Sequence, residues 1–122
     1  METKEIKIKS KELKDALKAA ADEHYETAFV VISGKEYGFR AVTRKEWRKM
    51  MAERNAKLEA AGEDIKAAVE IQEDEIENLV ELCLVHPIIP VDRMLAGVVD
   101  TLSNEILALS GFAGADFEAV KL

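Results

Sequence analysis

The sequence predicts an α+β fold: a mainly helical single domain of about four helices with a small antiparallel β-hairpin. Four segments carry apolar residues at intervals of three and four, the spacing of one face of an α-helix. Between the first two segments lie two β-branched and aromatic runs separated by turn residues, which is the pattern of a hairpin. A length of 122 residues suits one typical domain, so we expect a single unit over residues 1–122.

The composition is that of a globular protein with a charge-rich surface, with 48% hydrophobic and 34% charged residues. The single cysteine, Cys83, excludes an internal disulfide and lies in an apolar run, which fits a reduced thiol in a cytosol. Residues 1–5 lack the apolar core of a signal peptide, and no apolar run approaches the roughly 18 residues of a membrane span. We therefore expect a soluble, cytoplasmic protein without membrane association.

The N-terminal third is predicted to hold one helix and the hairpin. A helix over residues 11–23 begins after Ser10, which is a good N-cap. The strands are expected at 27–32 and 36–42, on either side of the turn at Ser33, Gly34 and Lys35. An isolated hairpin is marginal in water, so one of its faces must pack against helices.

The sequence leaves two features near the hairpin undecided, the conformation of residues 1–9 and the role of Gly38. Residues 1–9 alternate Ile6 and Ile8 with lysines, which favours a third strand over a loose arm. Gly38, inside the second strand, is expected to mark a bulge or a close contact with another element.

The central stretch is predicted to be a pair of helices. Thr43 and Glu46 form a capping box that starts the first of them, and Trp47 lies on its apolar stripe. Gly62 closes this helix with a left-handed C-cap. The second helix is expected to begin at Glu63 and Asp64, with these acids in its first turn, and to end at Pro87.

The last helix is predicted to follow an extended connection over residues 88–91. Asp92 is its expected N-cap, and Ser110 and Gly111 are expected to end it. Phe112, just after the glycine, is expected to fold back on the final helical turn. Residues 113–122 are interpreted as a mobile tail.

Charge is strongly polarised along the sequence, although the total is −7. Residues 35–57 hold eight bases against three acids, whereas residues 63–81 hold eight acids against one lysine. One interpretation is that the basic and acidic helices fold back as an antiparallel pair with opposite charges beside a shared apolar seam. The rival interpretation reserves a charged face for another protein. The candidate partner-binding residues are Glu70, Glu73, Asp74, Glu77, Glu81, Arg44 and Arg48.

No motif indicates a reaction centre. The acids of the second central helix share a face, but calcium and magnesium sites need ligands that converge from a loop or several elements. Cys83 and His86 are three residues apart, yet a thiol enzyme also needs an oxyanion hole, and Cys83 belongs to the apolar stripe. Basic residues around Trp47 suggest nucleic acid, which the acidic total opposes. We expect no catalytic residue, no cofactor, no metal and no nucleic acid, and a protein partner; a homo-oligomer is an open alternative.

Three signatures in sequence order carry a resemblance. They are Tyr37-x-Phe39-Arg40-x-Val42-Thr43-Arg44-x-Glu46-Trp47, then Cys83-Leu84-Val85-His86-Pro87, and finally Ala96-Gly97-Val98-Val99-x-x-Leu102-x-x-Glu105-Ile106-Leu107-x-Leu109-Ser110-Gly111-Phe112. In this order they resemble the small tail-assembly proteins of tailed bacteriophages, chaperone-like products usually encoded beside the tape-measure protein. The resemblance spans about residues 29–112.

This resemblance implies a non-enzymatic role: to bind a long, aggregation-prone helical tail protein, the tape-measure protein, in the cytoplasm of the infected bacterial host and hold it for assembly with tail-tube subunits. Two alternatives remain, a minor structural component of the virion tail or baseplate and a small regulator that binds a host protein. The resemblance carries over no catalytic residue. Its motif positions are structural first, and they include Thr43, Glu46, Trp47, Pro87, Gly111 and Phe112.

Overall fold

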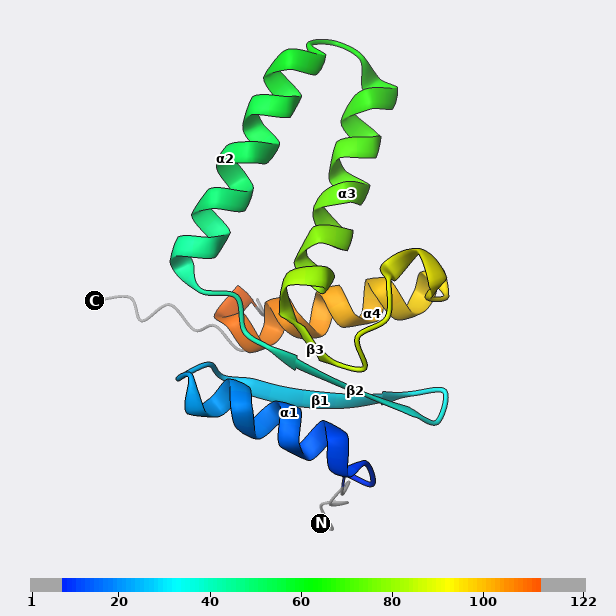
Figure 1. The fold of residues 1–122 in the computed structure, drawn as a ribbon. Helices are drawn as coiled ribbons and strands as arrows, with labels where there is room; N and C mark the ends of the chain where they lie inside the picture. Colours follow the sequence, from blue (N-terminus) through cyan, green and yellow to red (C-terminus); the bar gives the residue numbers. More distant parts are fainter. Residues whose placement is uncertain (1–7, 113–122) are drawn as a thin grey trace, which may run out of the picture.

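The computed structural model describes residues 8–112. These residues form four α-helices and one three-stranded antiparallel sheet, so the predicted α+β, mainly helical fold class is confirmed (Figure 1). The predicted tail at 113–122, like residues 1–7, lies outside the described residues. In chain order the elements are α1 (Lys11–Asp22), β1 (Thr27–Ile32), β2 (Lys35–Arg40), α2 (Arg44–Ala61), α3 (Ile65–Cys83), β3 (Leu84–His86), a 3₁₀ turn η1 (Val91–Arg93), α4 (Ala96–Leu107) and a π-type turn η2 (Ala108–Phe112).

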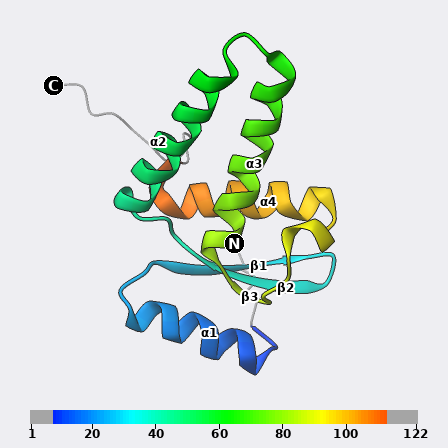
Figure 2. The same cartoon turned by 45° about the horizontal axis from the view of Figure 1, so that its top comes forward.

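The sheet separates α1 from the other helices. Helix α1 covers one face of the sheet, and α4 and the lower part of α3 lie on the other face (Figures 1 and 2). The hydrophobic core lies on this second side, where Tyr37 and Phe39 of β2 meet buried residues of α3 and α4. From this base the α2–α3 pair projects as an antiparallel helical hairpin, and α2 contains no buried residue.

The predicted β-hairpin is confirmed. Strands β1 and β2 pair in a register that sets Ile32 opposite Lys35, leaving Ser33 and Gly34 as a two-residue turn. Both turn residues have positive φ, 51° for Ser33 and 79° for Gly34, which matches the right-handed twist of the strands it joins.

The described third strand comes from a segment for which no strand was expected. The candidate strand at residues 1–9 lies outside the described residues except for residues 8 and 9, which carry no regular structure. Residues 84–86 pair with β2 as β3. Helix α3 therefore ends at Cys83 and not at Pro87, because Leu84 turns to extended dihedrals and the open edge of β2 accepts the chain. Pro87 instead follows a strand, consistent with the extended conformation that proline favours in the residue before it.

Gly38 marks a close contact, as expected. Its neighbours Tyr37 and Phe39 point to the core, so Gly38 faces α1 on the opposite side of the sheet. A Cβ atom at this position would overlap Leu13 Cδ1 and would lie 3.1 Å from Leu17 Cδ2. The absence of a side chain lets α1 lie directly on the strand.

Hydrogen bonds from side chains cap three helices. The Ser10 hydroxyl accepts from the Leu13 amide at 3.2 Å, and the predicted capping box of Thr43 and Glu46 is present in both directions. Asp64 is the N-cap of α3, accepting from the Ala67 amide, and not a residue of its first turn. Gly62 ends α2 with φ 60° and ψ −123°, a positive-φ conformation outside the left-handed helical region that we expected.

The start of the last helix differs from the prediction. Asp92 lies in the turn η1, and α4 begins at Ala96 after Leu95, which provides no side-chain cap. Val91 is only 6% exposed and anchors this turn in the core, so the chain reaches α4 later than the sequence pattern suggested. Leu95, the residue before α4, is 75% exposed.

The end of the last helix packs against α2. Gly111 has φ 93°, the left-handed region that suits glycine, and breaks the helix as predicted. Phe112 was expected to fold back on the final turn, but its ring lies against Trp47, with ring centroids 4.6 Å apart. The Ser110 hydroxyl donates to the Ile106 carbonyl at 2.7 Å and accepts from the Val42 amide at 2.9 Å. These contacts connect the end of α4 to the start of α2.

The Trp47–Phe112 contact leads to a prediction. Phe112→Ala is expected to lower the free energy of unfolding by about 0.5–1.5 kcal/mol, the range for an aromatic pair, since Phe112 is half exposed. Trp47 is the only tryptophan, so its fluorescence should shift to longer wavelength without unfolding of the domain. Phe29→Ala, at a residue in β1, is the control that should leave the folded-state emission unchanged. An unchanged emission in Phe112→Ala would show that the contact between the two rings does not form in solution.

Candidate partner-binding site

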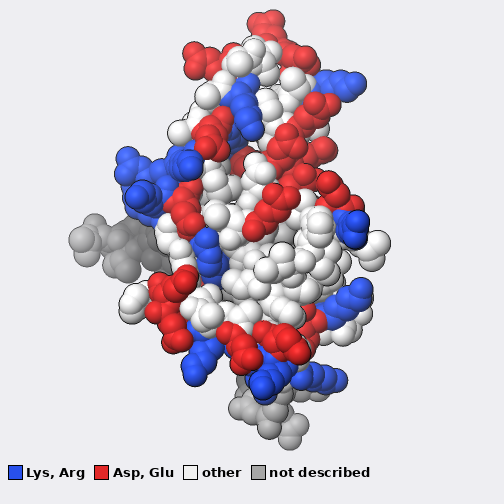
Figure 3. Space-filling model, in the orientation of Figure 1, with Lys and Arg blue, Asp and Glu red and all other residues white. Residues whose placement is uncertain are grey.

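The five predicted acids all lie on α3. Spacings of three and four residues place them on one side of this helix, where Glu70, Glu73, Asp74 and Glu81 are exposed and Glu77 is half-buried. Figure 3 shows acidic side chains along α3 and basic side chains beside α2. The structure therefore brings the acidic half of the predicted site together on one surface.

Two further acids belong to this surface and were missed from the sequence. Asp92 of η1 and Asp100 of α4 line a hollow together with Glu73 and Glu77. Partial burial, and then the nearby carboxylates with Asp92 first among them, raise the pKa of Glu77 above its ordinary value. The sequence pattern predicts Asp92 as a helix cap, whereas its position beside α3 depends on the path of residues 84–95, which no local pattern indicates.

The two predicted basic residues lie apart from the groove between the two helices. Arg44 and Arg48 are exposed on α2 and do not line the groove between the two helices. Within residues 8–112, the ion pair that joins α2 to α3 is Arg54–Glu75, with 3.4 Å between Arg54 Nη1 and a Glu75 oxygen. The helices are antiparallel as expected, but one ion pair rather than a series of opposite charges connects them.

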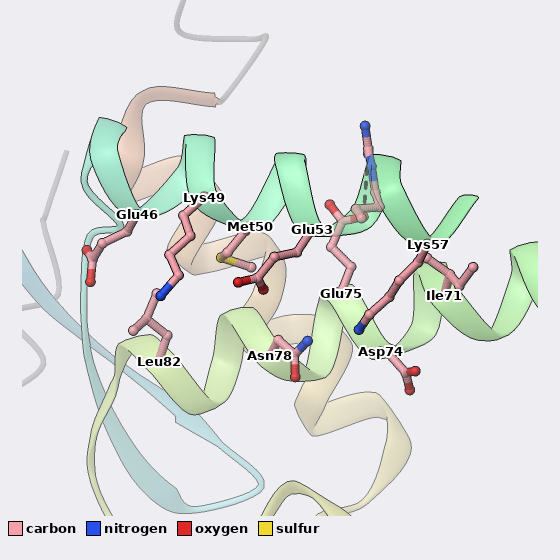
Figure 4. A pocket seen from close by; sticks show the side chains of 11 residues that line it. Glu46, Lys49, Met50, Glu53, Lys57, Ile71, Asp74, Glu75, Asn78 and Leu82 are labelled. Carbon is pink, nitrogen blue, oxygen red and sulfur yellow. Dashed lines mark hydrogen bonds and ion pairs between the residues drawn. The ribbon is translucent and has the colours of Figure 1, made fainter. Parts of the chain in front are cut away.

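A groove of about 420 Å³ runs between α2 and α3 (Figure 4). Its apolar part consists of Met50, Ile71 and Leu82, and Leu82 is 38% exposed. Charged and polar residues make up the rest of the lining: Glu46, Lys49, Glu53, Arg54, Lys57, Asp74, Glu75 and Asn78. The groove therefore combines an exposed apolar floor with charged sides.

The lower end of α2 is fixed by a charge cluster. Arg40 donates to both oxygens of Glu46, at 2.9 and 2.8 Å, and to the Ala41 carbonyl at 3.0 Å. Its guanidinium also lies 4.1 Å from the centre of the Tyr25 ring. The bonds from Arg40 lower the pKa of Glu46 to about 2, and the same bonds raise the pKa of Arg40. This cluster joins the end of β2 to the capping box, so it sets where α2 leaves the sheet.

Cys83, the cysteine considered as a nucleophile from the sequence, is a residue of the core. Cys83 is fully buried in the core, and burial raises the pKa of its thiol to about 11, so it is protonated at neutral pH. This confirms its interpretation as a core cysteine. Among the described residues, no group of three or more His, Cys, Asp or Glu side chains is arranged to hold a metal ion. No helix between residues 8 and 112 is both long and apolar enough to cross a membrane.

The motif residues serve packing and capping. Thr43 and Glu46 start α2, Trp47 meets Phe112, and Gly111 allows the turn that brings this phenylalanine to α2. Comparison of the chain with protein-family models, with curated proteins and with solved structures found no match.

Proposed function

We propose that this protein is a phage tail-assembly chaperone, which binds a long helical tail protein, the tape-measure protein, during morphogenesis. The observation that carries the proposal is the projecting α2–α3 hairpin, whose exposed surfaces are polarised in charge and partly apolar. The order of sequence motifs between residues 29 and 112 supports the same assignment. The proposed partner is a protein, and the proposed place of action is the cytoplasm of the infected bacterium.

The hairpin has the properties that such a role requires. It exposes apolar side chains away from the core, with Ile65 80% and Val69 48% exposed near its tip. Apolar groups exposed on a surface favour contact with another protein, and charges around them set the partner and the rate of encounter. A chaperone of a helical protein needs this combination, because it must cover apolar stripes without becoming insoluble itself.

Co-expression with the tape-measure protein encoded beside this gene tests the proposal. We expect the tape-measure protein to remain soluble and to co-purify with the chain, and to aggregate when expressed alone. Purified phage particles should lack the chain, which mass spectrometry can measure. Failure to bind the tape-measure protein would overturn the proposal, and stoichiometric recovery of the chain in particles would assign it to the virion.

A further inference from the structure

The groove between α2 and α3 has two edges of different charge. Lys49, Glu53 and Lys57 form the α2 edge, which has one more positive than negative charge. The α3 edge contains Asp74, and Glu70 and Glu81 lie on the same side of that helix. A molecule that fills the groove therefore meets a basic edge on one side and an acidic edge on the other.

These charges are available to a partner. Glu46 is held by Arg40, and Arg54 is paired with Glu75 inside the groove. Within the part of the chain that the structure describes, Lys49, Lys57 and Asp74 have no opposite charge within 4 Å. Figure 4 shows the Lys57 side chain extending from α2 toward α3 near Asp74, at the right-hand end of the groove in that view.

The shape of the groove suits a helix. The lining residues on α2 span 46–57, which corresponds to about 18 Å or three turns at a rise of 1.5 Å per residue. Two antiparallel helices with an open groove can accept a third helix, whose apolar residues at i, i+3, i+4 and i+7 enter between them. The floor of Met50, Ile71 and Leu82 provides the matching apolar surface.

We propose that this groove binds an amphipathic α-helix of about three turns, whose apolar stripe packs on Met50, Ile71 and Leu82. The bound helix carries acidic residues on the side that faces α2 and basic residues on the side that faces α3. The identity of the protein that contains this helix rests on the proposed function, in which the helix belongs to the tape-measure protein. The chemistry of the helix rests on the groove alone.

The charge pattern also dictates direction. Turning a helix end for end in a groove exchanges its two edges, so a helix with one acidic and one basic edge fits in one direction only. A peptide with the same apolar stripe but with its Glu and Lys positions exchanged should therefore bind in the opposite direction. This consequence separates charge recognition from simple apolar contact.

Titration with a designed peptide tests the inference. The probe is a fluorescent 18-residue helical peptide with a Leu stripe, Glu on one edge and Lys on the other, followed by fluorescence anisotropy. A peptide of the same composition in scrambled order is the control. We expect saturable binding of the stripe peptide only, and equal binding of both peptides, or of neither, overturns the proposal.

Variants locate the binding surface. Leu82→Gln is expected to weaken binding about tenfold, whereas Leu95→Gln, the same change at an exposed leucine outside the groove, should have no effect. Asp74→Lys should weaken binding, and Asp15→Lys, an exposed acid on α1, serves as its control. Circular dichroism verifies that each variant is folded. Equal losses in Leu82→Gln and Leu95→Gln would place the site elsewhere.

Orientation is measured with a nitroxide at the peptide N-terminus. Paramagnetic broadening should affect amides near Gly62, at the tip of the hairpin, for one peptide and amides near Thr43 for the charge-exchanged peptide. Broadening of the same amides by both peptides would refute recognition by charged edges. Light scattering of the chain alone gives another overturning outcome, a dimer that Leu82→Gln dissociates, since the groove would then belong to a second copy.

The two proposals fail in different ways. If the tape-measure protein binds both the wild-type chain and Leu82→Gln equally, the groove assignment is wrong and the chaperone function stands. If the tape-measure protein does not bind but the stripe peptide does, the groove assignment stands and the function is wrong.

Discussion

Replacing Gly38 with valine is expected to lower the free energy of unfolding by about 3 kcal/mol, the upper end of the usual cost of overpacking. Even a Cβ atom at Gly38 overlaps Leu13 Cδ1 and approaches Leu17 Cγ to 3.3 Å. Leu13 is fully buried, so it cannot move aside into solvent. The result should be a lower denaturant midpoint and a melting temperature lower by roughly 10 °C, because each kcal/mol shifts a domain of this size by about 3–5 °C.

The same position offers a matched control. Gly38→Ala should still destabilise the protein, whereas Gly97→Ala in α4 has open space around the new Cβ and should stabilise it by about 0.5–1 kcal/mol. Leu13→Ala in the Gly38→Ala background should cost less than in wild type, because it removes the clashing atom. Additive effects of the two changes would show that the contact is not the cause.

The sequence predicted the elements that are determined by local patterns. The capping box at Thr43, the hairpin turn at Ser33 and Gly34, and the break at Gly111 depend on residues adjacent in the chain, and all three are present. The buried state of Cys83 also followed from the stripe on which it lies. The close contact at Gly38 could be anticipated, but its partner α1 could not be named.

The errors come from contacts between distant segments. The helix that was expected to reach Pro87 ends at Cys83 because the edge of β2 pairs with residues 84–86, and no local pattern encodes that pairing. Phe112 meets Trp47, which is 65 positions earlier, and a propensity argument sees only the nearby helical turn.

The candidate site likewise combines a part that local sequence patterns predict with a part that depends on contacts between distant segments. Its acidic row follows from helical spacing and was predicted from the sequence, whereas its groove depends on how far α2 and α3 diverge. The basic residues that enter the groove, Lys49 and Lys57, are therefore not the predicted Arg44 and Arg48. Helical spacing alone does not tell which side of α2 faces α3.

A second large effect on stability is expected at the base of α2. Arg40→Met is expected to lower the free energy of unfolding by about 2–3 kcal/mol, because it removes a bidentate charge-assisted bond and leaves Glu46 without its cation. The Arg40 side chain is only 11% exposed, and methionine retains much of its apolar contact. Arg48→Met, at an exposed arginine of α2, should be nearly neutral.

The contribution of Glu46 should also depend on pH. Its folded-state pKa of about 2 lies below the ordinary value of 4.5, so its stabilisation is complete above pH 4.5 and is lost as pH falls toward 2. One quarter of the side chain is exposed, and screening limits the contribution to about 1–2 kcal/mol. Glu46→Gln should therefore be less stable than wild type at pH 7, with a difference that shrinks in acid.

Urea unfolding of wild type and of Glu46→Gln at pH 7, 4 and 2.5 measures the difference in their free energies of unfolding. The titration of all other carboxylates cancels in this difference. Glu53→Gln, the same change at an exposed glutamate of α2, should show little effect at any of these pH values. If the loss of unfolding free energy in Glu46→Gln stays constant with pH, the substitution acts through altered packing or hydrogen bonding and not through the lost charge. A deficit that disappears in acid and is also absent in the Arg40→Met background would establish that the ion pair between β2 and α2 positions the base of the hairpin.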